Sequence, residues 1–177
     1  REGTLAVISN SASLKQRDLD TARQFCDEHD IPLLEIDARE IDDPNYASNP
    51  VNRCYFCKTA LYTSMQRLRA GHYPGHRILN GNNFSDFGDY RPGLEAADEH
   101  RVLSPLAECG FSKDDIRAMA KHFRLSTWDK PASPCLSSRF PYGHPITVEK
   151  LRQVEDGEEL LAAYGFDNMR LRHHGDT

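Results

Sequence analysis

The chain of 177 residues is long enough for one domain, or for one domain and part of a second. A hydrophobic fraction of 38% supports a core, and 22 basic against 27 acidic side chains give a net charge of −5, which disfavours a nucleic-acid partner. No apolar run reaches the roughly 18 residues that span a bilayer, and no signal peptide opens the chain, so we expect neither membrane association nor secretion. Five cysteines, an odd number, argue against a disulfide framework and favour a reduced, cytoplasmic protein.

Short apolar runs alternate with stretches of helical periodicity between residues 5 and 123. We expect strands at residues 5–8, 31–36 and 77–80, and helices at residues 14–29, 52–68 and 112–123, the last opened by a capping box of Ser112 and Asp115. This alternation is typical of an α/β fold with a parallel sheet. Ligands bind beyond the carboxyl ends of such strands, where we expect residues 9–11, residues 80–83 and the loop after residue 103 to gather.

The chain changes character after Trp128, where prolines and glycines form a long loop. A helix at residues 147–164 is then expected, followed by a strand whose Arg170 and Arg172 share one face. This face is a candidate for binding anions, although a solvated edge strand would look the same. We place a domain boundary after residue 140, so that residues 1–140 form the α/β domain and 141–177 begin a smaller α+β domain. Because the chain starts without Met and stops just after the last expected strand, we expect both ends to be cut from a longer protein.

Two cysteines three residues apart open one of the expected helices. Cys54 and Cys57 share a face of its first turn, where the helix dipole, aided by Arg53 and Lys58, lowers thiol pKa and favours the thiolates that bind metals. The alternative is that both thiols belong to the apolar stripe of the helix. The two basic neighbours are unusual for such a stripe and favour metal or redox chemistry.

A third cysteine, Cys135, lies in a proline-stiffened loop at residues 132–141. With Cys54 and Cys57 it makes a three-thiolate set with one open metal position, which suits an iron–sulfur cluster better than a closed structural zinc site. Candidates for the fourth ligand that zinc would need are His122, His144 and His173. The alternative for Cys135 is an ordinary loop thiol.

The segment 80–93 is unusually polar for a stretch that follows a strand. Asp86 and Asp89 are candidates for holding Mg²⁺ or positioning a nucleotide, and Arg91 is a candidate for a phosphate. The alternative is that these residue types simply make turns.

Together these segments resemble the LarE family, ATP-dependent sulfur transferases of the PP-loop (ATP pyrophosphatase) superfamily. The matching segments, in family order, are NRCYFCK at 52–58, GDYRPGL at 88–94, WDKPA at 128–132, PCLSSRFPYG at 134–143 and RLRHHGD at 170–176. The resemblance implies an adenine-nucleotide-alpha-hydrolase-like, Rossmann-like parallel sheet that lacks its N-terminal P-loop strand. The family's Ser-Gly-Gly-x-Asp-Ser loop, which cradles the ATP phosphates, would precede Thr4 and is missing. We therefore expect the 177 residues alone to be inactive towards ATP.

The resemblance implies a role in building the nickel-pincer nucleotide cofactor. Family members use ATP and Mg²⁺ to adenylate a carboxylate of a pyridinium mononucleotide, release AMP and insert sulfur. Cys135 matches the family's conserved thiol, which one branch consumes as the sulfur donor, whereas a three-cysteine branch binds a [4Fe-4S] cluster that carries the sulfur. With Cys54 and Cys57 present, the chain is similar to the second branch. The resemblance further assigns to nucleotide or substrate phosphates Ser138, Arg139, Arg170 and Arg172.

The expected partner is therefore a small-molecule nucleotide, and the family implies a homo-oligomer. Two alternatives remain. One is a PP-loop tRNA-thiolating enzyme, against which the net charge of −5 argues. The other is a non-catalytic zinc-binding module in which the three cysteines and a histidine staple the loop to the helix.

Overall fold

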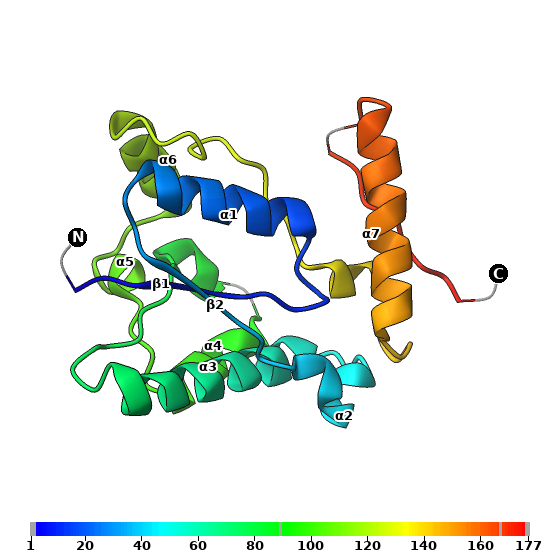
Figure 1. Ribbon diagram of the computed structural model, residues 1–177, viewed down its shortest axis with the longest axis horizontal. Helices are drawn as coiled ribbons and strands as arrows, with labels where there is room; N and C mark the ends of the chain where they lie inside the picture. Colours follow the sequence, from blue (N-terminus) through cyan, green and yellow to red (C-terminus); the bar gives the residue numbers. More distant parts are fainter. Residues whose placement is uncertain (1–2, 89, 167, 176–177) are drawn as a thin grey trace. The chain divides into compact units, whose positions relative to one another are not determined.

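The α/β character expected from the sequence is confirmed by the computed structural model, which describes residues 3–88, 90–166 and 168–175. These residues contain one parallel pair of strands and seven α-helices (Figure 1). The chain divides into two compact units, the first formed by Arg1–Arg53 and Ala132–Thr177 and the second by Cys54–Pro131. The domain boundary expected after residue 140 stays a prediction.

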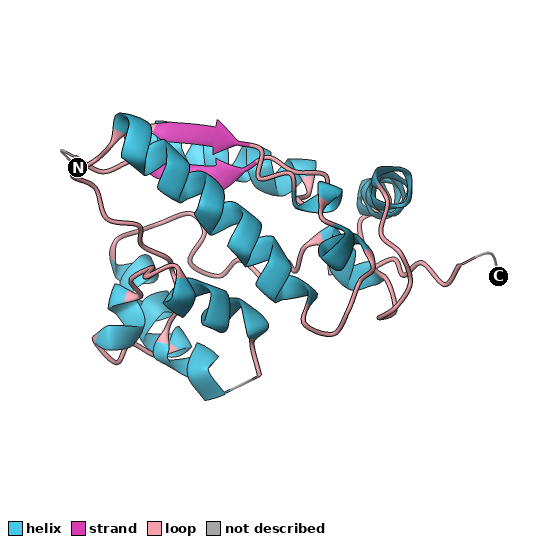
Figure 2. Cartoon of the chain, turned by 90° about the horizontal axis from the view of Figure 1, so that it is seen from below, coloured by secondary structure: helices cyan, strands magenta, loops and turns pink. Residues whose placement is uncertain are grey.

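The first unit is built around a short parallel sheet (Figure 2). Strand β1 (Ala6–Ser9) pairs with β2 (Leu33–Ile36), as the apolar runs predicted, and the helix α1 (Gln16–Glu28) connects them. Parallel strands need such a crossover because the chain must return to the same end of the sheet. The buried side chains of Leu19 and Cys26 lie on α1.

Three short helical segments and one long helix complete the first unit. They are η1 (Glu40–Asp42), α2 (Pro44–Ala47), η3 (Leu136–Arg139) and α7 (Val148–Ala163). The α7 helix starts where the sequence predicted, because the Thr147 side chain accepts a hydrogen bond from the Lys150 N–H and so satisfies a donor of the first turn. Leu151 and Val154 are buried on its inner face, and its main neighbour is η3.

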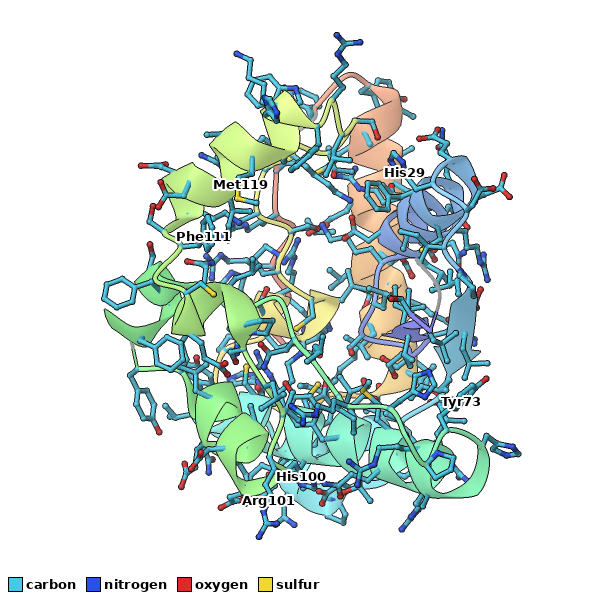
Figure 3. All side chains as sticks on the ribbon, turned by 90° about the vertical axis from the view of Figure 1, so that its left-hand side faces the viewer. His29, Tyr73, His100, Arg101, Phe111 and Met119 are labelled. Atoms are coloured by element: carbon cyan, nitrogen blue, oxygen red, sulfur yellow. The ribbon has the colours of Figure 1, made fainter. Side chains whose placement is uncertain are left out.

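The second unit is helical and has its own small core. Its helices are α3 (Arg53–His72, whose first residue belongs to the first unit), η2 (Phe84–Gly88), α4 (Pro92–Glu99), α5 (Pro105–Glu108) and α6 (Lys113–His122). The core consists of Tyr62, Ile78, Ala96, Ala97 and Val102. His100, labelled in Figure 3, directly follows α4. Its ring lies 5.9 Å from that of Tyr62. The capping box expected at Ser112 and Asp115 is confirmed, and the Ser112 hydrogen bonds lower the pKa of the Asp115 carboxyl. Within the described ranges no helix is long and apolar enough to cross a membrane.

Two expected strands are wrong in the part of the chain that the structure describes. Residues 77–80 contribute only a single parallel bridge, between Leu79 and Leu103. Residues 168–175 form no strand, because their backbone is bonded elsewhere. The Leu171 N–H donates to the Glu158 carboxylate, and the His173 N–H donates to the Arg139 carbonyl. A strand forms only when a neighbour accepts its ladder of hydrogen bonds, and alternation in one segment does not supply that neighbour.

A matched pair of leucines on α7 tests this packing. Leu151 is 1% exposed and Leu160 is 60% exposed. Leu151→Ala leaves a cavity and is expected to lower the free energy of unfolding by about 3 kcal/mol. Leu160→Ala removes little buried surface and is expected to change it by less than about 0.5 kcal/mol. Denaturant unfolding followed by circular dichroism measures both, and equal losses would contradict this position of α7.

Candidate functional site

The thiol of Cys135 is exposed, whereas the residues that follow it are buried. It is the residue that precedes η3, where the chain enters the 3₁₀ turn in an extended conformation. The next two residues, Leu136 and Ser137, are fully buried. The Leu136 N–H donates to the carbonyl of Ser13, in the loop that follows β1. The thiol is therefore accessible while the backbone beneath it is anchored in the core of the first unit.

Arg139 holds the same turn from inside. Its side chain is 2% exposed, and its Nη1 donates to the Pro134 carbonyl at 3.0 Å and to the Ser138 hydroxyl at 2.8 Å. A longer contact of 3.4 Å joins Nη1 to the carbonyl of Cys135. The remaining donors bind Glu158, with Nε 2.7 Å from one carboxylate oxygen and Nη2 3.1 Å from the other. The guanidinium expected to face a nucleotide phosphate is thus engaged by a carboxylate and by its own loop.

Glu158 is the centre of a buried ion cluster. Besides Arg139 it binds Lys15, whose Nζ lies 2.7 Å from Oε2, and both of these side chains are buried. Burial disfavours the ionised carboxylate, but the hydrogen bonds from Arg139 and Lys15 outweigh it and lower the pKa of Glu158. Sequence reasoning missed both Glu158 and Lys15. The available signal was the position of Glu158, an acidic residue seven positions after Leu151 on the apolar face that also carries Val154.

The segment before α3 supports the turn from another direction. Arg53 was expected to act on the thiols of Cys54 and Cys57, but its side chain is buried. Its Nη1 donates to the Ser137 carbonyl at 3.0 Å and to the side-chain oxygen of Asn49. The Arg53 side chain therefore binds the turn that follows Cys135.

The second unit brings two of the motifs together. Cys54 and Cys57 lie in the first turn of α3 as expected, with Cys54 exposed and Cys57 partly buried. The start of α4 packs on this turn, since a Cβ placed on Gly93 would lie 3.1 Å from Cγ of Lys58 and 3.7 Å from the Cys54 carbonyl. No group of three or more Cys, His, Asp or Glu side chains converges within the described residues.

Of the remaining predicted residues, Asp86 is partly buried, and Arg91, Arg170 and Arg172 are exposed. Asp86 and Arg91 form an ion pair of 2.7 Å, and Asp86 also accepts hydrogen bonds from the backbone and side chain of Asn83. Asp89 lies outside the described residues. The side chains of Arg170 and Arg172 are exposed, in the segment whose His173 is bonded to Arg139 and stacks on Phe140 with ring centroids 5.2 Å apart. These two arginines thus belong to the neighbourhood of η3.

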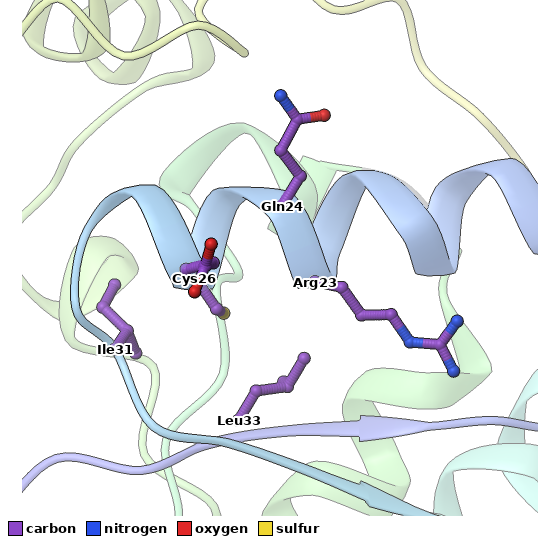
Figure 4. Close-up of a pocket in the computed structure, with 6 residues that line it drawn as sticks. Arg23, Gln24, Cys26, Ile31 and Leu33 are labelled. Carbon is purple, nitrogen blue, oxygen red and sulfur yellow. The ribbon is translucent and has the colours of Figure 1, made fainter.

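An open pocket of about 590 Å³ lies between α1 and β2 (Figure 4). Its lining consists of Arg23, Gln24, Cys26, Asp27, Ile31 and Leu33. None of the predicted site residues lines it. The cation at its rim, Arg23, is already paired with Glu35 at 2.6 Å.

Comparison with known proteins gives clear relatives, although no protein-family model matches the chain. The chain is 41% identical over 171 residues to an uncharacterized protein of Synechocystis sp., covering 97% of the chain and 63% of that relative. It is 32% identical over 176 residues to the pyridinium-3,5-bisthiocarboxylic acid mononucleotide synthase of Lactiplantibacillus plantarum, covering 99% of the chain and 63% of the synthase. An uncharacterized protein of Methanocaldococcus jannaschii is 31% identical over 126 residues, 71% of the chain and 49% of that protein. The chain thus spans less than two thirds of the length of these relatives.

Replacing Glu158 tests the ion cluster. Glu158→Gln leaves Arg139 and Lys15 buried without an anion and is expected to lower the free energy of unfolding by about 3 kcal/mol at neutral pH. Because the folded state lowers the pKa of Glu158 from its ordinary 4.5, its contribution is complete above pH 4.5 and is lost as the pH falls through the folded-state pKa. The difference between wild type and variant should therefore shrink below pH 4.5. The exposed Glu159→Gln on the same helix is the control, and a difference that persists at low pH would contradict the account.

Proposed function

The chain belongs to the LarE family, and we propose that the whole protein is an ATP-dependent sulfur transferase of nickel-pincer nucleotide biosynthesis. The support is the 32% identity that extends over 99% of the chain to a pyridinium-3,5-bisthiocarboxylic acid mononucleotide synthase. The parallel β1–α1–β2 crossover is consistent with the Rossmann-like sheet of an AMP-forming ATP pyrophosphatase. The substrate in this proposal is a pyridinium mononucleotide that bears a carboxylate.

The reaction proceeds in two displacements. A carboxylate oxygen of the substrate attacks the α-phosphorus of ATP and expels pyrophosphate, giving an acyl adenylate. A sulfur nucleophile then attacks the acyl carbon and expels AMP, leaving a thiocarboxylate. Adenylation is needed because a carboxylate oxygen is a poor leaving group and AMP is a good one.

Cys135 is the residue on which we base the sulfur chemistry. Its thiol is exposed, whereas hydrogen bonds from Arg139 and Arg53 fix the carbonyls on either side of it. As a proposed ligand on a fixed backbone, Cys135 would hold the transferable sulfur in a set position, so that this sulfur loses less entropy on reaching the acyl carbon. This combination of an exposed thiol and a restrained backbone is the structural observation that best supports the proposal.

The proposed cluster ligands are Cys54, Cys57 and Cys135. Thiolates are the usual ligands of a [4Fe-4S] cluster, and none of these three side chains belongs to the buried core, so the donor set suits the group. When bound, the cluster supplies the transferable sulfide. The exposed Arg170 and Arg172 are proposed to bind phosphates of the nucleotide substrate, and Asp86 with Asp89 and Arg91 to position ATP and Mg²⁺. Ser138 and Arg139 are proposed to contribute to the same phosphate site, with Arg139 keeping its bonds to Glu158 and to the loop.

Cysteine replacement tests the assignment of the sulfur site. In the full-length protein, Cys54→Ala, Cys57→Ala and Cys135→Ala are each expected to abolish catalytic sulfur insertion, because each removes a ligand. The matched control is Cys109→Ala, which removes an exposed thiol at the end of α5 and should leave turnover unchanged. Thiocarboxylate formed per protein measures the effect. Undiminished turnover in Cys54→Ala would contradict the cluster, and undiminished turnover in Cys135→Ala would contradict the whole assignment.

Metal content tests the cluster independently of activity. Full-length protein purified without oxygen is expected to contain about four irons and a matching amount of acid-labile sulfide, lost in Cys135→Ala. Stoichiometric zinc without iron or sulfide would favour the structural zinc module instead. Absence of both metals, with Cys135 converted to dehydroalanine after turnover, would make that thiol the consumed sulfur donor. Co-purifying tRNA would support a tRNA-thiolating enzyme.

A further inference from the structure

We infer that Arg53 is a positioning residue for the Cys135 thiol, an inference that rests on the sulfur transfer proposed above. Arg53 directly precedes Cys54, and its position in the sequence suggests a charge that assists that thiol. The structure gives its side chain a different task. It is 5% exposed and reaches the turn that follows Cys135, two residues from the thiol-bearing residue.

Three contacts define this task. The guanidinium donates to the Ser137 carbonyl at 3.0 Å, donates to the Asn49 side-chain oxygen, and lies 5.9 Å from the centre of the Tyr142 ring. Ser137 belongs to the Cys135 loop, and Tyr142 directly follows it. A guanidinium is suited to such a site because its planar fork can satisfy several acceptors at once while stacking on an aromatic ring.

Asn49 extends the hold to the far end of the loop. It is completely buried, its Nδ2 donates to the Pro141 carbonyl at 2.8 Å, and its carbonyl accepts the Gly143 N–H at 2.8 Å. Its φ of 56° lies in the left-handed region, which asparagine tolerates better than most residues. Tyr46 adds a hydrogen bond of 2.5 Å between its hydroxyl and that of Ser137. Residues 46–53 therefore form hydrogen bonds with residues 137, 141 and 143.

The energetics favour a positioning role over simple packing. A buried guanidinium loses its hydration, and an apolar side chain of similar length would fill the same volume without that cost. What the apolar side chain cannot do is fix the Ser137 carbonyl. Together with Arg139, which binds the Pro134 carbonyl, Arg53 restrains the backbone on both sides of Cys135. Misplacing the sulfur that Cys135 would hold slows its displacement of AMP steeply, so these two restraints speed sulfur transfer.

Arg53→Met in the full-length protein tests the inference, with Arg69→Met as the matched control at an exposed position of the same helix. Amide hydrogen exchange of residues 136–140 is expected to accelerate about tenfold in Arg53→Met, and to stay at the wild-type rate in the control. The kcat for sulfur insertion is expected to fall about tenfold or more, while the KM for ATP changes less than about twofold. Arg53→Lys, which keeps one charged donor, is expected to recover part of both effects.

Two results would overturn the inference. One is a wild-type exchange rate for residues 136–140 in Arg53→Met. The other is a kcat that stays at the wild-type value once it is calculated per folded protein, because loss of folded protein alone lowers the apparent kcat and leaves KM unchanged. If Arg53→Met fails to fold, Arg53→Lys alone decides through the same two readouts. Failure of the proposed function is a separate result. Cys135→Ala would then form as much thiocarboxylate as wild type, whatever the exchange rates show.

Discussion

The structure around Cys135 depends on the ion pair between Arg139 and Glu158. It joins the η3 turn to the middle of α7, and through Lys15 to the start of α1. A carboxylate so buried is costly unless its partners saturate it, and here two cations and the Leu171 N–H do so. Removing Glu158 leaves two buried cations uncompensated, so this one carboxylate ties the three elements together.

This cluster explains how an exposed thiol and a rigid backbone occur in the same short turn. The turn forms few backbone hydrogen bonds of its own, since a 3₁₀ segment of four residues cannot make many. Side chains supply the remainder, with Arg139 binding the carbonyl before Cys135 and Arg53 the carbonyl two residues after it. Cys135 itself stays exposed. For sulfur transfer the benefit is direct, because a nucleophile that must meet an acyl adenylate gains rate from being held in place.

Local signals predicted the local features well. The apolar runs gave β1 and β2, the Ser112 capping box gave the start of α6, and the periodicity after Thr147 gave α7. The predictions that failed were those of strands, which form only with a partner far away in the sequence. Residues 77–80 and 169–174 have the pattern of strands, but whether a ladder forms depends on a neighbour that the segment itself does not encode.

The same contrast between local signals and distant partners holds for the site. The motif pointed to Cys135 and Arg139, but nothing in the spacing revealed that Arg139 would bind Glu158, 19 residues away on another helix. Arg53 was expected to act on its sequence neighbours and instead acts across the fold, because its side chain turns inward where α3 begins. The residue type shows which interactions a side chain can make, and the tertiary packing decides with which partner it makes them.

The central claim is that sulfur ends in a nucleotide thiocarboxylate while ATP is converted to AMP. The most direct measurement supplies full-length protein with ATP, Mg²⁺ and a pyridinium mononucleotide carboxylate, and identifies the products by mass spectrometry. The account predicts AMP and the thiocarboxylate, with sulfur that derives from the protein. A correctly folded, cofactor-loaded protein that forms neither product, or forms AMP without transferring sulfur, would contradict it.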